Sequence, residues 1–260
     1  MKLNVKSNDI DFGTNILNIS VPSKLRERYP CGVPFIDDAF GGEGFTPSTV
    51  TLFTGEPGAG KTTMMLTLAN ALTSQGYVCL FNTAEESLYQ VKLTCERLGL
   101  TDGFIAGQET NVHYLLGQVD KLRNANPGKQ VFLVVDSLQT LELSKGEDKN
   151  NAVGALQYLT DYAKKNYINI VCIGQVNKSG SMAGSQKLKH MVDSMIHLYI
   201  EKKDQDFLGF RVLETVKNRF GGAGWTFFLD LKKDGFHEVA RLGANDWLKY
   251  VIKTLMCHID

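Results

Sequence analysis

The sequence lacks an excess of charge of either sign, because its 260 residues carry 28 basic and 28 acidic side chains for a formal net charge of +0. Bulk charge therefore cannot attract a polyanion, and any contact with nucleic acid has to come from local patches or from several assembled subunits. No apolar run approaches the roughly 18 residues of a membrane-spanning helix, and the chain does not open on a signal peptide. We therefore expect a cytoplasmic protein without membrane contacts.

Cysteine is scarce and scattered along the chain. None of the five, Cys31, Cys79, Cys95, Cys172 and Cys257, belongs to a C-x-x-C pair. A structural zinc site needs closely spaced cysteines, and a disulfide framework needs a short chain that is dense in them. Because Cys79 and Cys172 lie inside apolar, strand-like runs, we interpret the five as reduced core residues and expect neither zinc nor disulfides.

Internal repeats, low-complexity segments and strong linkers are absent as well. A chain of this length with 43% hydrophobic residues can bury a sizeable core. Residues 1–28 are polar and only weakly periodic, so we expect an N-terminal arm there and one folded domain over residues 29–260.

What the sequence does contain is a glycine-rich stretch between an apolar strand and a helix. Residues 55–62 read G-x-x-x-x-G-K-T, after an apolar run at 50–53 and before a helical pattern at 61–75. In this pattern backbone N–H groups and the helix start cradle phosphate oxygens, the lysine reaches the β and γ phosphates, and the threonine hydroxyl coordinates Mg²⁺. We therefore predict a nucleoside-triphosphate site formed by Gly55, Glu56, Pro57, Gly58, Ala59, Gly60, Lys61, Thr62 and Thr63.

Apolar strand-like runs alternate with helical patterns beyond this loop. The expected strands are 77–81, a short one near Phe104, 130–135 and 169–173, and the expected helices are 87–98, 112–124 and 151–165. Four further strand-like runs, 195–200, 210–216, 225–231 and 236–239, follow one another with short turns. This order predicts an α/β fold with a mainly parallel central sheet flanked by helices and an antiparallel extension at the C-terminal end.

An acidic residue ends the most apolar of these strands. Asp136 follows the apolar residues 131–135, and Mg²⁺ bound beside a phosphate loop needs a second anchor. We therefore predict that Asp136 and Thr62 together hold the metal ion. The alternative for Asp136 is an ordinary cap of the following turn.

Two adjacent acids follow the strand at 77–81. Glu85 and Glu86 lie at the sheet edge where open α/β folds bind ligands, so either could polarise a water in line with the γ phosphate. Acids before a helix are also favourable N-terminal charges, which is the alternative for this pair. Gln175, just past the strand at 169–173, is expected to sense the γ phosphate from the same edge.

With these segments in order, the sequence resembles the ATPase core of the RadA/Sms branch of the RecA superfamily, over almost its whole length after Tyr29. The segments that carry the resemblance are 31–38, 55–62, 84–87 with 90–100, 135–141, and 217–221, which reads K-N-R-F-G. The run H-M-V-D-S at 190–194 strengthens the match.

The resemblance implies a RecA-like P-loop ATPase that uses ATP and Mg²⁺, binds single-stranded DNA and promotes branch migration in recombination and repair. It implies a homo-oligomer, a hexameric ring or a filament, with active sites between subunits. Lys217 and Arg219 would then act on the neighbour's nucleotide, where a cation stabilises transition-state charge. An exposed basic pair at a hairpin turn is the alternative for these two. The implied catalytic residues are Lys61, Glu85, Glu86, Gln175, Lys217 and Arg219.

In this superfamily the loops after the Asp136 and Gln175 strands face a central channel. Here they are residues 144–151 and 177–187, the second rich in glycine and serine. Small residues with a few cations suit contacts to a nucleic-acid backbone without sequence readout, although a solvated loop or a lid is the alternative. The lysines expected to contact DNA are Lys145, Lys149, Lys178, Lys187 and Lys189.

The resemblance also has gaps. RadA proteins usually begin with a four-cysteine zinc finger and end with a Lon-protease-like domain, and this sequence shows neither, as in the stand-alone cores of some bacteriophages. Two other families stay open. DnaB-type replicative helicases share the phosphate loop, although Phe220 after Arg219 departs from their usual small residue. KaiC-like ATPases share the core and paired glutamates but normally duplicate the domain, and they would remodel protein complexes without moving DNA.

Overall fold

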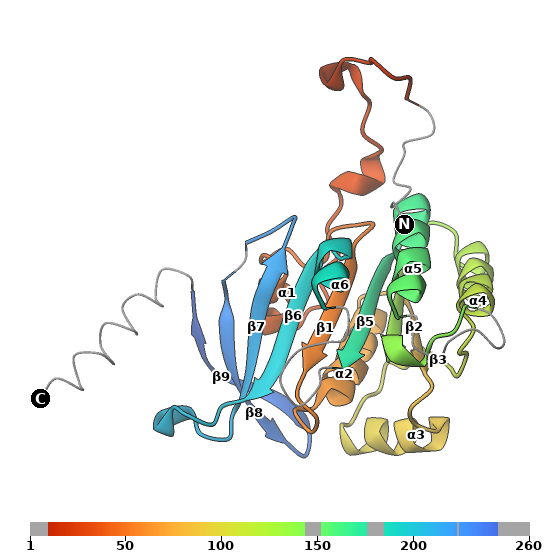
Figure 1. The fold of residues 1–260 in the computed structure, drawn as a ribbon. Helices are drawn as coiled ribbons and strands as arrows, with labels where there is room; N and C mark the ends of the chain where they lie inside the picture. Colours follow the sequence, from red (N-terminus) through yellow and green to blue (C-terminus); the bar gives the residue numbers. More distant parts are fainter. Residues whose placement is uncertain (1–9, 144–151, 176–184, 223, 244–260) are drawn as a thin grey trace, which may run out of the picture.

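The computed structural model describes residues 10–143, 152–175, 185–222 and 224–243, and within these ranges one sheet runs through the whole fold (Figure 1). Its nine strands follow the order β3-β2-β4-β5-β1-β6-β7-β8-β9. The strands from β3 to β6 are parallel, and those from β6 to β9 are antiparallel. Their bounds are β1 Val50–Gly55, β2 Val78–Thr83, β3 Ile105–Gly107, β4 Val131–Asp136, β5 Asn169–Gln175, β6 Ser194–Ile200, β7 Arg211–Asn218, β8 Thr226–Lys232 and β9 Gly235–Leu242.

Helices cover both faces of the sheet, which is why its central strands are apolar along their whole length. On β4, Phe132 and Val134 join the apolar cluster of α1 and α2, whereas Leu133 and Val135 join the cluster of α4, α5 and α6. The helices are α1 Pro34–Ala39, α2 Lys61–Ser74, α3 Leu88–Arg97, α4 Val112–Ala125, α5 Ala152–Asn166 and α6 Ser185–Met191. The predicted fold class is therefore confirmed, with the parallel part and the antiparallel extension where the sequence indicates them.

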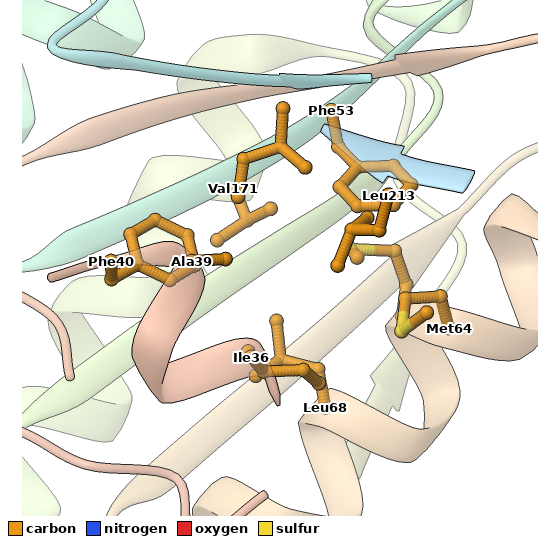
Figure 2. Close-up of a pocket in the computed structure, with 10 residues that line it drawn as sticks. Ile36, Ala39, Phe40, Phe53, Met64, Leu68, Val171 and Leu213 are labelled. Atoms are coloured by element: carbon orange, nitrogen blue, oxygen red, sulfur yellow. The ribbon is translucent and has the colours of Figure 1, made fainter. Parts of the chain in front are cut away.

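The core under α1 and α2 is tightly filled. Figure 2 shows Ile36, Phe40, Met64 and Leu213 among the side chains that close around a small apolar space there. This space measures about 10 Å³, the room of a single water molecule, and it has no polar lining. It is a packing gap in the core, too small to hold a ligand.

One helix was not expected from the sequence. The predicted loop at 177–187, with its continuation to Lys189, gives way at Ser185 to α6. Leu188 is fully buried in the cluster that also contains Leu156 and Leu159 of α5, so packing stabilises a helix that the glycine- and serine-rich sequence before it does not suggest. The loop prediction is therefore wrong for residues 185–189.

The described part of the arm, residues 10–28, lies mostly in solvent and contains two short 3₁₀ turns, Ile16–Asn18 and Ser23–Arg26. Tyr29 begins the core, where its main chain bonds to that of Phe45. Cys79 and Cys172 are buried in β2 and β5 as predicted, while Cys95 on α3 is only partly buried. Across the ranges that the structure covers, the helices are all too short or too polar to cross a membrane.

Candidate functional site

The phosphate loop leaves β1 at Gly55 and enters α2 at Lys61. Gly60 has a φ of 101°, and a Cβ at this position would lie 2.9 Å from Cζ of Phe236 in β9. The loop therefore needs glycine both for its backbone conformation and for the close approach of the β8–β9 hairpin. Lys61 folds back over the loop, and its Nζ donates to the carbonyl oxygens of Gly55 at 3.0 Å and Glu56 at 2.9 Å.

The predicted metal ligands lie side by side at the end of β4. Thr62 Oγ1 donates to Oδ2 of Asp136 at 2.7 Å, and Asp136 is 2% exposed. Burial raises the pKa of Asp136 to about 6, against the opposing hydrogen bond from Thr62. A hydroxyl and a buried carboxylate beside a phosphate loop form the oxygen-rich environment that Mg²⁺ prefers, so these residues fit that ion.

The two predicted glutamates both lie near Asp136, since the charge of each raises the pKa of that residue, but among the described residues they differ in their hydrogen bonds. Glu85 Oε1 accepts hydrogen bonds from Ser137 Oγ and from Nε2 of Gln175, the latter at 2.7 Å. Glu86 is held through its main chain, whose carbonyl accepts from Nε2 of Gln108 at 3.0 Å. The structure thus brings together Glu85 and Gln175, which are 90 residues apart in sequence.

Two contacts at this edge involve residues to which the sequence analysis assigned no role. Ser137 is fully buried directly after Asp136, and its position after that strand was the available clue. Lys202, just past β6, places its Nζ 2.7 Å from Oε2 of Glu56 in the phosphate loop. No local pattern could have indicated this contact, since 146 residues separate the pair.

The K-N-R-F-G element lies at the opposite end of the strands from the phosphate loop, near the N-terminal ends of β1 and β6. Lys217 pairs with Met195 at the start of β6, whereas Gly55 pairs with Leu198 near its end. The run from Val50 to Gly55 separates this element from the phosphate loop, roughly 16 Å at ~3.3 Å per residue of parallel strand. The element is therefore too far away to reach the phosphate loop of its own subunit.

Both predicted cations of this element have partners within the subunit. Lys217 Nζ donates to the carbonyl oxygens of Lys189 at 2.8 Å and Val192 at 2.6 Å, at the C-terminal end of α6. Arg219 forms a 3.3 Å ion pair with Asp193, and its side chain is 51% exposed. Half of the Arg219 side chain is therefore exposed to solvent, whereas the amine of Lys217 is hydrogen-bonded to main-chain carbonyl groups at the end of α6.

The predicted DNA contacts are only partly described. Lys187 and Lys189 are exposed on α6, just after the segment that leads away from Gln175. Lys145, Lys149 and Lys178 lie outside the described residues. The DNA-binding role of all five lysines stays a prediction.

Comparisons with known proteins agree with this geometry. The family model described as "ATPase: KaiC" matches residues 29–105. The DNA repair protein RadA of Mycolicibacterium smegmatis is 31% identical over 230 residues, which make up 85% of this chain and 47% of the relative. The DNA repair protein RadA of Streptococcus pneumoniae is 34% identical over 203 residues, 76% of this chain and 46% of the relative. The chain thus spans about half the length of these relatives.

Solved structures show the same fold. A DnaB-like replicative helicase superposes with a TM-score of 0.71 at 17% identity, covering 82% of this chain and 62% of the other. A KaiC-like protein of Pyrococcus horikoshii superposes with a TM-score of 0.66 at 21% identity, covering 82% of this chain and 99% of the other. At such identities the match supports the architecture alone.

The sheet order, the phosphate loop and the acidic residue at the end of β4 are those of the RecA-like P-loop ATPase fold, and the family-model match to residues 29–105 agrees with an ATPase domain. Within this class, the sequence relatives confirm the similarity to the ATPase core of the RadA DNA repair proteins.

Proposed function

We propose that this chain is a Mg²⁺- and ATP-dependent motor of RadA type, which binds single-stranded DNA and acts in recombination and repair by branch migration. The observation that carries the proposal is the division of the site between the two ends of the parallel strands. The phosphate loop, Asp136 and Glu85 lie at the C-terminal ends of these strands. Arg219 lies at their N-terminal ends, with half of its side chain exposed. Two subunits packed head to tail would complete the site.

Within one subunit, each residue at the phosphate-loop edge has a distinct task. The loop N–H groups and Lys61 bind the β and γ phosphates, and Lys61 exchanges its two carbonyl partners for phosphate oxygens. Thr62 and Asp136 would hold Mg²⁺, which offsets phosphate charge when bound. Glu85 orients the attacking water and accepts its proton, and Gln175 contacts both Glu85 and the γ phosphate.

The neighbouring subunit supplies the missing positive charge. Arg219 would contact the γ phosphate across the boundary and stabilise charge in the transition state, a contribution of roughly 10³ to 10⁵ in rate in other ATPases and GTPases. Lys217, the second predicted cation, would first have to leave two carbonyl oxygens of α6. We therefore propose Arg219 as the main group acting on the neighbour's nucleotide.

DNA would contact Lys187 and Lys189, which are exposed on α6. Gln175 ends β5 and also donates to Glu85, so a displacement of Gln175 when DNA binds would alter the environment of the base. This connection supports stimulation of hydrolysis by DNA. Because contacts through a few lysines release counterions, binding should weaken as salt rises.

A second candidate is a KaiC-like ATPase that remodels protein complexes, which the family match at residues 29–105 favours. A third is a replicative helicase of DnaB type, which the shared fold of the DnaB-like helicase leaves open. The RadA relatives match a larger part of the sequence than the family model does, and this supports the first proposal.

The deciding experiment is ATP hydrolysis with and without single-stranded DNA at two salt concentrations, with mass photometry of the same samples. Stimulation that weakens at high salt and accompanies a ring or filament is expected for the DNA motor. Hydrolysis that ignores DNA would instead favour the remodelling ATPase. A strand-displacement assay on a fork, against a branch-migration assay on a three-strand junction, separates the helicase from the RadA-type motor.

A further inference from the structure

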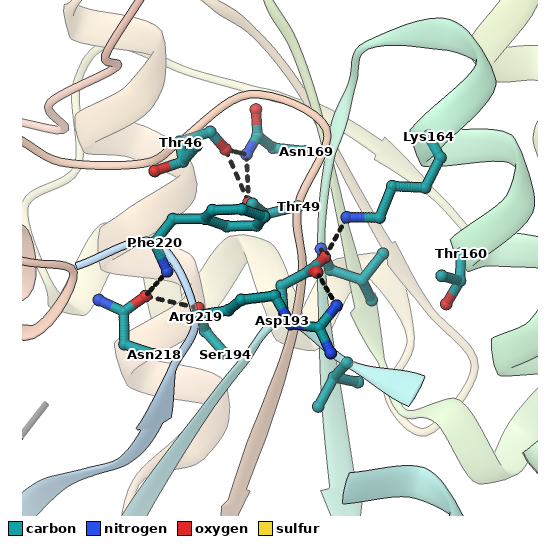
Figure 3. Close-up of polar contacts among 12 residues, drawn as sticks. Thr46, Thr49, Thr160, Lys164, Asn169, Asp193, Ser194, Asn218, Arg219 and Phe220 are labelled. Atoms are coloured by element: carbon teal, nitrogen blue, oxygen red, sulfur yellow. Dashed lines mark hydrogen bonds and ion pairs between the residues drawn. The ribbon is translucent and has the colours of Figure 1, made fainter. Parts of the chain in front are cut away.

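A buried carboxylate lies directly behind the K-N-R-F-G element (Figure 3). Asp193, in the turn before β6, is fully buried, and its Oδ2 accepts from the main-chain N–H of Val50 at 3.0 Å. The same Oδ2 lies 2.5 Å from Nζ of Lys164 on α5, and Oδ1 lies 3.3 Å from a guanidinium nitrogen of Arg219. One carboxylate is therefore shared by two cations that come from different elements.

The two cations are held unequally. The contact of Asp193 with Lys164 is the shorter of the two, 2.5 Å against 3.3 Å for Arg219, and the Lys164 side chain is 21% exposed. Arg219 makes one long contact to the carboxylate, although its guanidinium has five N–H donors. Lys217 also lies close enough to be affected by the charges of Asp193 and Arg219, so the cations around Asp193 outnumber its single negative charge, and Arg219 is the one with half of its side chain exposed.

The main chain and an aromatic ring complete the arrangement. The N–H of Arg219 donates to the carbonyl oxygen of Asp193 at 3.0 Å, which fixes the backbone of the element beside the carboxylate. Nζ of Lys164 also lies 5.6 Å from the centroid of the Phe220 ring, within cation–π range. Phe220 itself is 47% exposed, so this contact lies at the surface of the subunit.

We propose that Asp193 and Lys164 are positioning residues for Arg219. Asp193 restrains the guanidinium group at the surface of the subunit. Lys164, which contacts Phe220, competes with Arg219 for the negative charge of Asp193, so the positive charge of Arg219 is not fully compensated. The arrangement thus presents a pre-oriented cation to the neighbouring nucleotide, and it rests on the proposed function of Arg219. Pre-orientation matters because a misplacement of about 1 Å can cost on the order of 10²-fold in rate.

The test is Asp193→Asn in the full chain, with kcat, KM and the affinity for a fluorescent ATP analogue measured together. We expect kcat to fall roughly 10- to 100-fold. Nucleotide affinity should stay within about twofold of the wild-type value, because the phosphate loop lies at the opposite end of the strands from Asp193. The matched control is Ser194→Ala, which removes a hydrogen bond to Asn218 of the same element and no charge. An unchanged kcat for Asp193→Asn overturns the proposal.

Mixing subunits separates positioning from a structural role. Asp193→Asn subunits have an intact phosphate loop, so Lys61→Ala subunits, which supply an intact Arg219, should restore part of their turnover. If Asp193→Asn subunits that are folded and co-assembled with Lys61→Ala subunits regain no turnover, that result contradicts the proposal. The double variant Asp193→Asn/Arg219→Ala should be no slower than Arg219→Ala alone, since both changes remove the same contribution.

Lys164→Gln provides a second variant in case Asp193→Asn does not fold. Without the lysine charge Arg219 pairs fully with the carboxylate, so kcat should again fall several-fold and Lys61→Ala subunits should restore it; a wild-type rate contradicts the proposal. Arg219→Ala alone separates the proposed action of Arg219 on the neighbour's nucleotide from its proposed positioning by Asp193 and Lys164. If Arg219→Ala keeps full turnover, the proposed action on the neighbour fails; if it loses turnover while Asp193→Asn and Lys164→Gln do not, only the positioning proposal fails.

Discussion

Oγ1 of Thr62 and Oδ2 of Asp136 lie 2.7 Å apart although 74 residues separate them in sequence. The contact joins the first turn of α2 to the end of β4 and brings both predicted Mg²⁺ ligands to one point. It also leaves a carboxylate buried with a hydroxyl as its hydrogen-bonded partner, a costly environment for an ionised group until a cation binds.

Asp136→Asn should therefore stabilise the ligand-free protein while it removes hydrolysis. Burial raises the pKa of Asp136 from 3.8 to about 6, so the folded carboxyl holds its proton more tightly than the unfolded one. Ionisation at pH 7 then costs stability, and the variant should gain about 1 to 3 kcal/mol in the free energy of unfolding by urea. The gain should shrink as the pH falls from about 6 towards 4, where both states become protonated.

The control for this prediction is Asp102→Asn, a change at an exposed carboxylate that bonds to Asn70. It should alter stability by no more than about 0.5 kcal/mol and leave hydrolysis unchanged. A destabilised Asp136→Asn protein at pH 7 would show that the carboxylate is not strained in the free protein.

The two adjacent glutamates should differ sharply. Glu85→Gln keeps the side-chain oxygen that accepts from Ser137 and Gln175 but removes the base, so turnover should fall roughly 10² to 10⁴-fold while ATP still binds. Glu86→Gln should cause a much smaller loss. Single-turnover hydrolysis of both variants, with nucleotide binding measured in parallel, checks this, and a larger loss at Glu86 would reverse the assignment.

Mixing two inactive variants tests hydrolysis between subunits. Lys61→Ala removes nucleotide binding but keeps Arg219, and Arg219→Ala keeps the phosphate loop but lacks the cation. In a mixed assembly an Arg219→Ala subunit can be completed by its Lys61→Ala neighbour, so part of the activity should return. A mixture as inactive as its components, despite co-assembly seen by mass photometry, would argue against a shared site.

Gly221 should be far more sensitive to substitution than Gly222. A Cβ at Gly221 would lie 2.7 Å from the carbonyl oxygen of Phe40 and 2.6 Å from Nδ2 of Asn218, so Gly221→Ala has to displace the K-N-R-F-G element. A Cβ at Gly222 meets nothing within 4 Å. We expect Gly221→Ala to lose about 1 to 3 kcal/mol in urea unfolding and to lower kcat, and Gly222→Ala to do neither. Equal effects would mean that the close packing against Phe40 is unimportant.

Several features of this protein follow from the sequence alone because they depend on neighbouring residues. The phosphate loop is one, since its glycines, Lys61 and Thr62 act within eight positions of one another. The order of strands and helices is another, because apolar runs and helical periodicity are local patterns. These were enough to predict the fold class and to place the candidate nucleotide site at the C-terminal ends of the parallel strands.

The tertiary structure decided what depends on residues far apart in the chain. Glu85 is distinguished from Glu86 by contacts to Ser137 and Gln175, which no local pattern encodes. The helix α6 forms because Leu188 packs against α5, and Arg219 is held by a carboxylate that also bonds to Val50, 143 residues away. Such contacts arise only when the sheet brings distant segments together, so side-chain orientation and pairing in the site come from the packing of the whole domain.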